Sequence, residues 1–164
     1  MNIPSAPTPE TPQHRAELTQ SIRAATGLDE AVLERLVRVF YGAAREDRLL
    51  GPVFAHVTDW EAHIRQICAF WSSVALMTGR YHGQPLAAHL PLPLGPEHFA
   101  RWLVLFGDTA RSVCSPEGAE YLIGKAHRIA RSLEIGIEVS RGVLPKGRDE
   151  GAAAGGGPGR LQRR

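Results

Sequence analysis

The chain has 164 residues, which is enough for one domain with a single sizeable core. Hydrophobic residues make up 43% of it and charged residues 22%, as in an ordinary globular protein, and the formal net charge is +2. The charge is unevenly placed, because residues 141–164 hold six arginines and lysines against two acidic residues. The rest of the chain is slightly acidic, so the sequence does not predict nucleic acid as a partner.

The cysteine content and the N-terminal sequence narrow the possible class of protein further. The two cysteines, Cys68 and Cys114, lack CxxC and CxxCH spacing, so neither a disulfide framework nor covalent haem attachment is indicated. The N-terminus has no apolar segment of the signal-peptide kind, and no run approaches the roughly 18 apolar residues of a membrane span. We therefore expect a cytoplasmic protein that does not bind a membrane.

The two ends of the chain differ in composition from its middle. Residues 1–13 contain four prolines and little that could be buried, and the stretch after residue 150 is rich in Gly and Ala. Both compositions are typical of segments that form no packed core. The sequence thus predicts a flexible extension over 1–13, a folded domain over 14–140 and a disordered tail over 141–164.

Within the predicted domain the hydrophobic periodicity is helical throughout. The first clear helix begins after a capping residue, Asp29, and a turn at Leu49-Leu50-Gly51-Pro52 stops it. Its apolar face follows helical spacing over Leu33, Leu36, Val37, Phe40, Tyr41 and Ala44. A second helix opens at Thr58-Asp59-Trp60-Glu61, read as a capping box, and Gly79 is expected to end it.

Prolines mark the remaining helices. Between Tyr81 and Gly95 the chain has three prolines, so this stretch has room for only a short helix, roughly over 85–89. Pro96 is in a favoured first position for the next helix, and Ser115-Pro116 opens a last one of about 20 residues. No segment alternates with period two, so the predicted fold class is all-α.

Two histidines, His63 and His89, lie among aromatic and apolar residues and are expected on opposite walls of one flat pocket. Spacing alone favours a core histidine satisfied by the protein over a metal ligand at either position. However, a buried histidine needs a partner for its ring nitrogens, and a metal would supply one. The apolar surroundings suit a large apolar cofactor better than a hydrated ion. The chain also lacks the Glu-x-x-His and His-Glu-x-x-His patterns of other helical metal sites, which leaves haem as the leading candidate.

Four of the other histidines are not expected to bind a metal or a cofactor. His56 and His82 fall in turns, where a solvated or backbone-bonded ring is expected, and His14 and His127 lie in or beside polar sequence and are expected to be exposed.

Several motifs occur in order at compatible spacing: Phe40-Tyr41, Asp47-Arg48-Leu49-Leu50-Gly51-Pro52-Val53-Phe54, Asp59-Trp60-Glu61-Ala62-His63, Phe70-Trp71, Tyr81-His82-Gly83-Gln84-Pro85, His89 and His98-Phe99-Ala100-Arg101-Trp102. Together they closely resemble the truncated haemoglobins, specifically their third group, over roughly residues 29–138. The resemblance implies a shortened globin fold, a two-over-two helical sandwich around a haem.

The resemblance also implies roles for matching positions. His89 matches the proximal histidine that binds the iron of haem b, and His63 matches the distal histidine found in many members. Tyr41 and Trp102 match two donors to the bound ligand, although helical spacing alone favours a packing role for both. Residues of the pocket wall are Phe54, Phe70 and Trp71 against the haem, and Ile67 on the distal side. Basic groups near the rim, Arg65 and His98, are expected to meet the haem propionates.

The function implied is reversible binding of diatomic gases (oxygen, nitric oxide and carbon monoxide) at a His-ligated iron. Two or three donors aimed at the ligand favour tight holding, because charge-assisted hydrogen bonds are roughly twice as strong as neutral ones. Tight holding suits redox chemistry on oxygen, nitric oxide or peroxide, of the nitric oxide dioxygenase or peroxidase kind, better than oxygen transport. The sequence predicts no reductase domain, so a separate reductase is an expected partner, and a monomer is favoured.

Two other classes stay open at this point. One is a haem-based sensor or haem carrier that acts through a protein partner, and the other is a helical interaction module without a cofactor.

Overall fold

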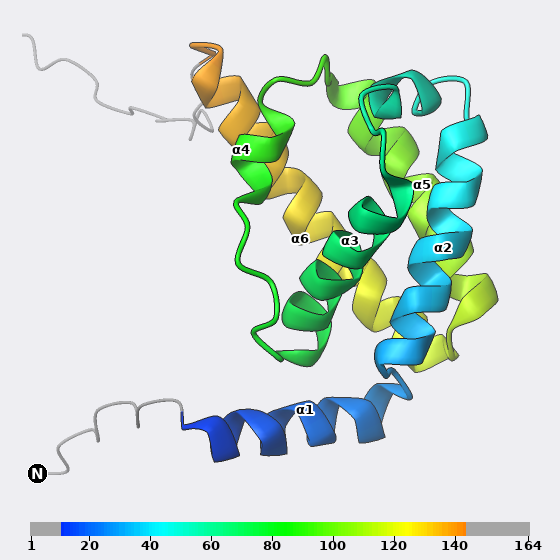
Figure 1. The fold of residues 1–164 in the computed structure, drawn as a ribbon, viewed down its shortest axis with the longest axis vertical. Helices are drawn as coiled ribbons and strands as arrows, with labels where there is room; N and C mark the ends of the chain where they lie inside the picture. The colour runs from blue at the N-terminus through cyan, green and yellow to red at the C-terminus, as the bar shows by residue number, and fades with distance from the viewer. Residues whose placement is uncertain (1–10, 144–164) are drawn as a thin grey trace, which may run out of the picture.

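The computed structural model describes residues 11–143, and Figure 1 shows helices throughout this range. The elements are α1 (Pro12–Thr26), α2 (Glu30–Glu46), the short 3-10 helix η1 (Gly51–Phe54), α3 (Trp60–Leu76), α4 (Pro85–His89), α5 (Pro96–Val113) and α6 (Pro116–Ser140). Over residues 11–143 there is no strand, which confirms the predicted fold class. Within the same range, no helix is both long enough and apolar enough to cross a membrane.

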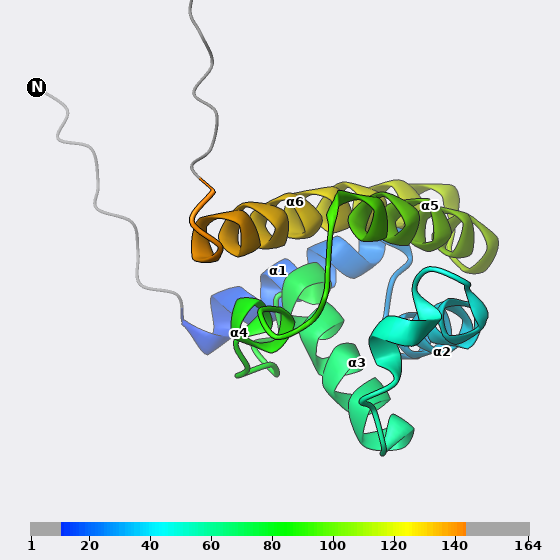
Figure 2. The ribbon, with the colours of Figure 1, turned by 90° about the horizontal axis from the view of Figure 1, so that it is seen from above.

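The helices form two layers around one core. Figure 2 shows α5 and α6 side by side in one layer, with α2, α3 and α4 on the other side. Helix α2 packs against both α3 and α5, whereas the short α4 packs against α6. A main cluster of buried side chains joins α2, α3, α5 and α6, and a smaller one joins η1, the segment before α5, α5 and α6.

Side-chain caps fix where the helices start. The Asp29 carboxylate accepts the Val32 N–H at 2.8 Å, as predicted, and Ser115 Oγ accepts the Gly118 N–H at 3.0 Å. The predicted capping box at Thr58 is wrong in detail, because the neighbouring residue Asp59 is the cap of α3 and accepts from Ala62. An Asp carboxylate in this position satisfies one of the free N–H groups of the first turn.

Two helix ends also differ from the prediction. Helix α3 ends at Leu76, and the left-handed residue that follows is Met77 (φ 59°) rather than Gly79, which comes two residues later. Helix α2 stops at Glu46, ahead of the predicted turn, because the Asp47 carboxylate accepts the N–H groups of Leu49 and Leu50 at 3.0 Å each. A carboxylate that bonds nearby backbone in this way competes with further helix.

The same turn positions η1, which contributes side chains to the internal cavity of the protein. Gly51 lies so close to α2 that a Cβ there would meet the backbone oxygen of Arg45 at 2.6 Å, so only glycine fits. Arg101 of α5 donates to the Asp47 carboxylate at 2.7 Å and ties the turn to the second layer. These hydrogen bonds hold the pKa of Asp47 below its usual value, the Leu50 N–H contributing most.

Helix α1 begins inside the predicted extension, at Pro12, and the sequence pattern did not distinguish it as a separate helix. It is attached by hydrogen bonds at its middle and at its C-terminal end: Thr19 Oγ1 donates to the Leu76 oxygen at 2.5 Å, and Ser115 Oγ donates to the Thr26 oxygen at 2.8 Å. Residues 1–10 of the extension predicted over 1–13, and residues 144–164 of the tail predicted over 141–164, lie outside the described residues.

Candidate functional site

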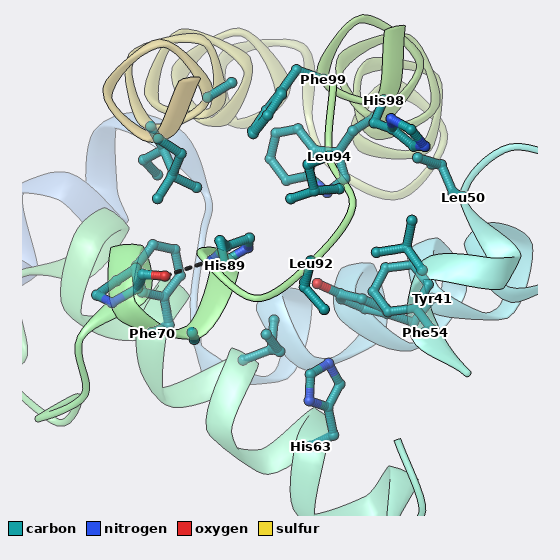
Figure 3. A pocket seen from close by; sticks show the side chains of 18 of the residues that line it. Tyr41, Leu50, Phe54, His63, Phe70, His89, Leu92, Leu94, His98 and Phe99 are labelled. Carbon is teal, nitrogen blue, oxygen red and sulfur yellow. Dashed lines mark hydrogen bonds between the residues drawn. The ribbon is translucent and has the colours of Figure 1, made fainter. Parts of the chain in front are cut away.

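A cavity of about 330 Å³ lies between the two layers. It is lined mainly by apolar and aromatic side chains, with a few polar groups that converge on it, which is typical of sites for small molecules and cofactors. Figure 3 shows the side chains entering from several elements. We call the cavity-facing side chains of α2, η1 and α3 the His63 wall, and those of α4 and residues 90–95 the His89 wall.

All but one of the site residues expected from the sequence line this cavity: Tyr41, Phe54, His63, Ile67, Phe70, Trp71, His89, His98 and Trp102. They are spread over 62 positions of the sequence and come together only through the packing of α2–α5. Arg65 is the exception, since it is exposed on α3 and does not line the cavity.

His89 is the last residue of α4, and its ring is oriented by the backbone. The Nδ1 atom lies 2.5 Å from the Pro85 oxygen, four residues earlier, as the dashed line in Figure 3 shows. A carbonyl oxygen can only accept, so Nδ1 carries the proton and Nε2 keeps its lone pair. A backbone carbonyl bonded to one ring nitrogen is how a metal-ligating histidine commonly has its tautomer fixed.

His63 enters the same cavity from α3 and is in the opposite situation. Its Nε2 atom is buried and has no hydrogen-bond partner among residues 11–143. Burial lowers the pKa of this ring, and the nearby His56 and His89 rings lower it further. The ring is therefore neutral at neutral pH, and it leaves one buried polar atom unpaired beside the cavity.

Tyr41 is buried on α2, with only 8% of its surface exposed. Its ring meets the His63 ring edge-on, with centroids 5.7 Å apart and planes at 90°. Burial raises the pKa of the hydroxyl well above its usual value, so the group stays protonated and can donate. In Figure 3 this hydroxyl points into the cavity.

Trp102 closes the cavity from α5. Its indole stacks on Phe106 with centroids 5.1 Å apart, and Phe106 stacks in turn on Trp71 at 4.9 Å. This stack fixes the indole plane, and no acceptor within the described range takes its N–H. Tryptophans that are largely covered usually have a partner for that group, and because Trp102 lines the cavity, a molecule bound there is a candidate acceptor.

His98 lies near the start of α5. Its Nδ1 atom accepts the Gly95 N–H at 3.0 Å, which in the neutral ring leaves Nε2 as the donor.

Several lining residues were not identified from the sequence. His56 bonds the Val53 oxygen through Nδ1 at 2.9 Å, as expected for a turn histidine, but its ring also lines the cavity. Leu92 and Leu94 line it from the loop after α4, and Arg141 donates to both of their carbonyl oxygens, at 3.4 and 2.8 Å. No sequence signal marks a contact between an arginine and a loop that precedes it by 47 positions.

The described residues contain no group of three or more His, Cys, Asp or Glu side chains able to hold a metal ion. A metal next to His89 would therefore need a cofactor that brings most of its own donor atoms.

No protein-family model matches the chain. It is 33% identical over 109 residues to the group 3 truncated hemoglobin ctb of Campylobacter jejuni, a match that covers 63% of this chain and 86% of that protein. Among solved structures, the group III truncated hemoglobin of Campylobacter jejuni matches with a TM-score of 0.61 and 34% identity, over 65% of this chain and 89% of that one.

Proposed function

The chain belongs to the group III truncated haemoglobins, and we propose that it holds haem b through His89 and binds diatomic gases at the iron. The proposal is carried by the orientation of His89, whose Nδ1 is committed to the Pro85 oxygen while Nε2 remains free on the cavity wall. Family membership implies the cofactor, and the cavity offers one oriented nitrogen ligand for it.

The residues present fit such a group. An apolar cavity between two layers suits a flat, largely apolar ring, and Phe54, Phe70 and Trp71 supply aromatic surface for it. When bound, haem supplies an iron centre that takes diatomic ligands and changes oxidation state. His98 is the basic group best placed at the cavity edge for a haem propionate, whereas the exposed position of Arg65 gives it a weaker role.

On the other side of the cavity, the protein's own groups would hold the ligand. Tyr41 and Trp102 each offer a donor without a protein acceptor in the described range, and their rings are fixed by packing. Donors positioned before the ligand arrives need no reorganisation, and the apolar walls exclude the water that would compete with them. Slow release follows from this arrangement, so we propose redox chemistry on oxygen, nitric oxide or peroxide rather than oxygen transport.

Titration of the purified full-length chain with haem tests the cofactor. We expect absorbance in the Soret region to rise to saturation near one haem per chain, and the ferrous band to shift with carbon monoxide. Absorbance that grows without saturation, as for haem free in solution, would contradict the proposal.

Consumption of nitric oxide tests the reaction. With oxygen and a chemical reductant, one nitric oxide and one oxygen molecule combine with one electron to give one nitrate ion. We expect catalysed loss of nitric oxide, or of peroxide in its place, that requires the haem-loaded protein. Fast oxygen release with neither substrate consumed would favour transport instead.

A further inference from the structure

Trp60, the first residue of α3, does not line the cavity, yet its ring contacts three residues that do. Its centroid lies 5.4 Å from that of His63, 5.9 Å from that of Phe54 and 6.1 Å from that of Tyr41. The planes of Trp60 and His63 meet at 84°, an edge-to-face arrangement that aromatic rings favour. Trp60 thus backs the His63 wall from outside the cavity.

His63 is held between two rings that are nearly perpendicular to its own. One ring belongs to Trp60 of α3 and the other to Tyr41 of α2, whose centroid lies 5.7 Å from that of His63. In this orientation Nε2 is buried without a partner in the described part of the chain. Rotation toward solvent would let water satisfy that atom, so the observed orientation needs contacts that oppose the rotation. The edge-on contacts with Trp60 and Tyr41 are contacts of this kind.

Trp60 is itself held by a cation–π contact with Arg45. The guanidinium carbon of Arg45, in the last turn of α2, lies 4.2 Å from the centroid of the Trp60 ring. A cation at this distance over an indole is attracted by the electron-rich ring face. Because Arg45 belongs to α2 and Trp60 to α3, the contact also links the end of one helix to the start of the other.

We propose that Trp60, held by Arg45, is a positioning residue that keeps the His63 ring turned into the cavity. Trp60 acts through His63 and touches no ligand. The role of His63 toward a ligand rests on the proposed function, whereas the ring orientation is a property of the chain and can be measured without haem.

The titration of His63 reports its orientation. With the ring turned inward, burial lowers its pKa, and His56 and His89 add to this effect. The other groups that face it are the neutral hydroxyl of Tyr41 and, behind the indole, the guanidinium of Arg45. If the ring turns out, burial is relieved, and the pKa rises toward the ordinary histidine value of 6.5.

The test is an NMR titration of the His63 ring in the full-length chain, prepared without haem and with haem plus carbon monoxide. We expect Trp60→Ala to raise the pKa of His63 toward 6.5, and Trp60→Phe, which keeps an aromatic ring, to restore much of the lowering. Arg45→Met removes the charge but keeps the apolar stem, so a smaller rise is expected. Lys125→Met is the matched control, since Lys125 makes a similar contact with Tyr121, at 5.3 Å, away from the cavity.

Ligand kinetics provide a second readout in the loaded protein. We expect Trp60→Ala to speed carbon monoxide association by about fivefold, the factor that corresponds to roughly 1 kcal/mol. The same substitution should have no further effect in a His63→Ala background, because the two residues act in series.

Different results would refute the proposed haem binding and the proposed role of Trp60. A chain that binds no haem but shows the pKa rise in Trp60→Ala keeps the inference and refutes the proposed function. An unchanged pKa of His63 in Trp60→Ala and Arg45→Met, with the remaining spectrum native, would overturn the inference. If Trp60→Ala does not fold, the comparison of Arg45→Met with Lys125→Met decides.

Discussion

The wall that carries His89 is held by hydrogen bonds to backbone oxygens, whereas the wall that carries His63 is held by aromatic rings. On the first, Pro85 fixes the His89 ring and Arg141 fixes the loop that follows. On the second, the rings of Tyr41 and Trp60 pack against a histidine whose inner nitrogen has no partner in the described range, and Phe54 packs against both of those rings.

This difference matches two different tasks. Hydrogen bonds have a preferred direction, so they suit a ring that must present one nitrogen at one place. Packed rings leave polar atoms uncommitted, so they suit a surface whose donors are needed by a ligand. The comparison predicts that the His89 wall governs retention of the cofactor, while the His63 wall governs the kinetics of small ligands.

The largest effect is expected from His89→Gly. Removal of the one oriented ligand should abolish most haem retention, and added imidazole, which fits the space left by the ring, should restore the spectrum. The His127→Ala control removes an exposed histidine of α6 and should behave as the wild type. A normal ferrous spectrum with carbon monoxide in His89→Gly without imidazole would assign the ligand to another residue.

The next largest effect is expected from Tyr41→Phe and Trp102→Phe. Each removes one donor, and loss of a hydrogen bond worth about 1.4 kcal/mol speeds ligand dissociation by about tenfold. Stopped-flow measurement of oxygen dissociation checks this, with haem retention expected to stay near normal. Tyr121→Phe is the control, because that hydroxyl donates to the Ala75 oxygen outside the cavity. Unchanged dissociation in both variants would remove these two residues from the ligand site.

A smaller effect on retention is expected from Arg141→Ala. Its two bonds to the loop over the cavity, at 2.8 and 3.4 Å, are partly exposed. Their loss, taken as about 1 kcal/mol, corresponds to about fivefold faster transfer of haem to a scavenger protein. Faster hydrogen exchange over residues 90–95 should accompany it, and Arg131→Ala, which removes an exposed arginine of α6, should show neither change. Altered oxygen dissociation with normal haem retention would break the division between the walls.

The smallest effect concerns pH and stability. Because the native pKa of His63 is lowered, the unfolded chain binds its proton first as pH falls below 6.5. The free energy of unfolding should therefore decrease with falling pH, by a small fraction of the roughly 1.4 kcal/mol per pH unit that uptake of one full extra proton would give. His63→Phe should reduce that slope in urea unfolding, whereas His127→Phe should leave it unchanged. An identical slope in all three proteins would mean that the ring is not buried in solution.

The elements that the sequence predicted best are those marked by local chemistry. Prolines and capping residues predicted α4 and the starts of α5 and α6, and an amphipathic face predicted α2. Helix α1 was not distinguished because little of its surface is apolar, and its attachment depends on distant partners such as Leu76. The end of α3 at Met77 was missed because a non-glycine residue in the left-handed region has no clear signal.

For the site, the resemblance to a family named the residues, and the helix packing shows that they line one cavity, Arg65 excepted. Contacts between segments remote in sequence could not be predicted. Neither the bond from Arg141 to the Leu94 oxygen nor the approach of Arg45 to Trp60 leaves a periodic or spacing pattern.

The central claim is that His89 Nε2 is the protein's ligand to the iron, and the iron–histidine stretching band in the resonance Raman spectrum tests it most directly. The ferrous, ligand-free protein would be prepared with ordinary histidine and with histidine labelled with heavy nitrogen. We expect one band that shifts with the label in the wild type and that no longer shifts in His89→Gly rescued by unlabelled imidazole. A label-sensitive band that persists in the rescued variant would contradict this expectation.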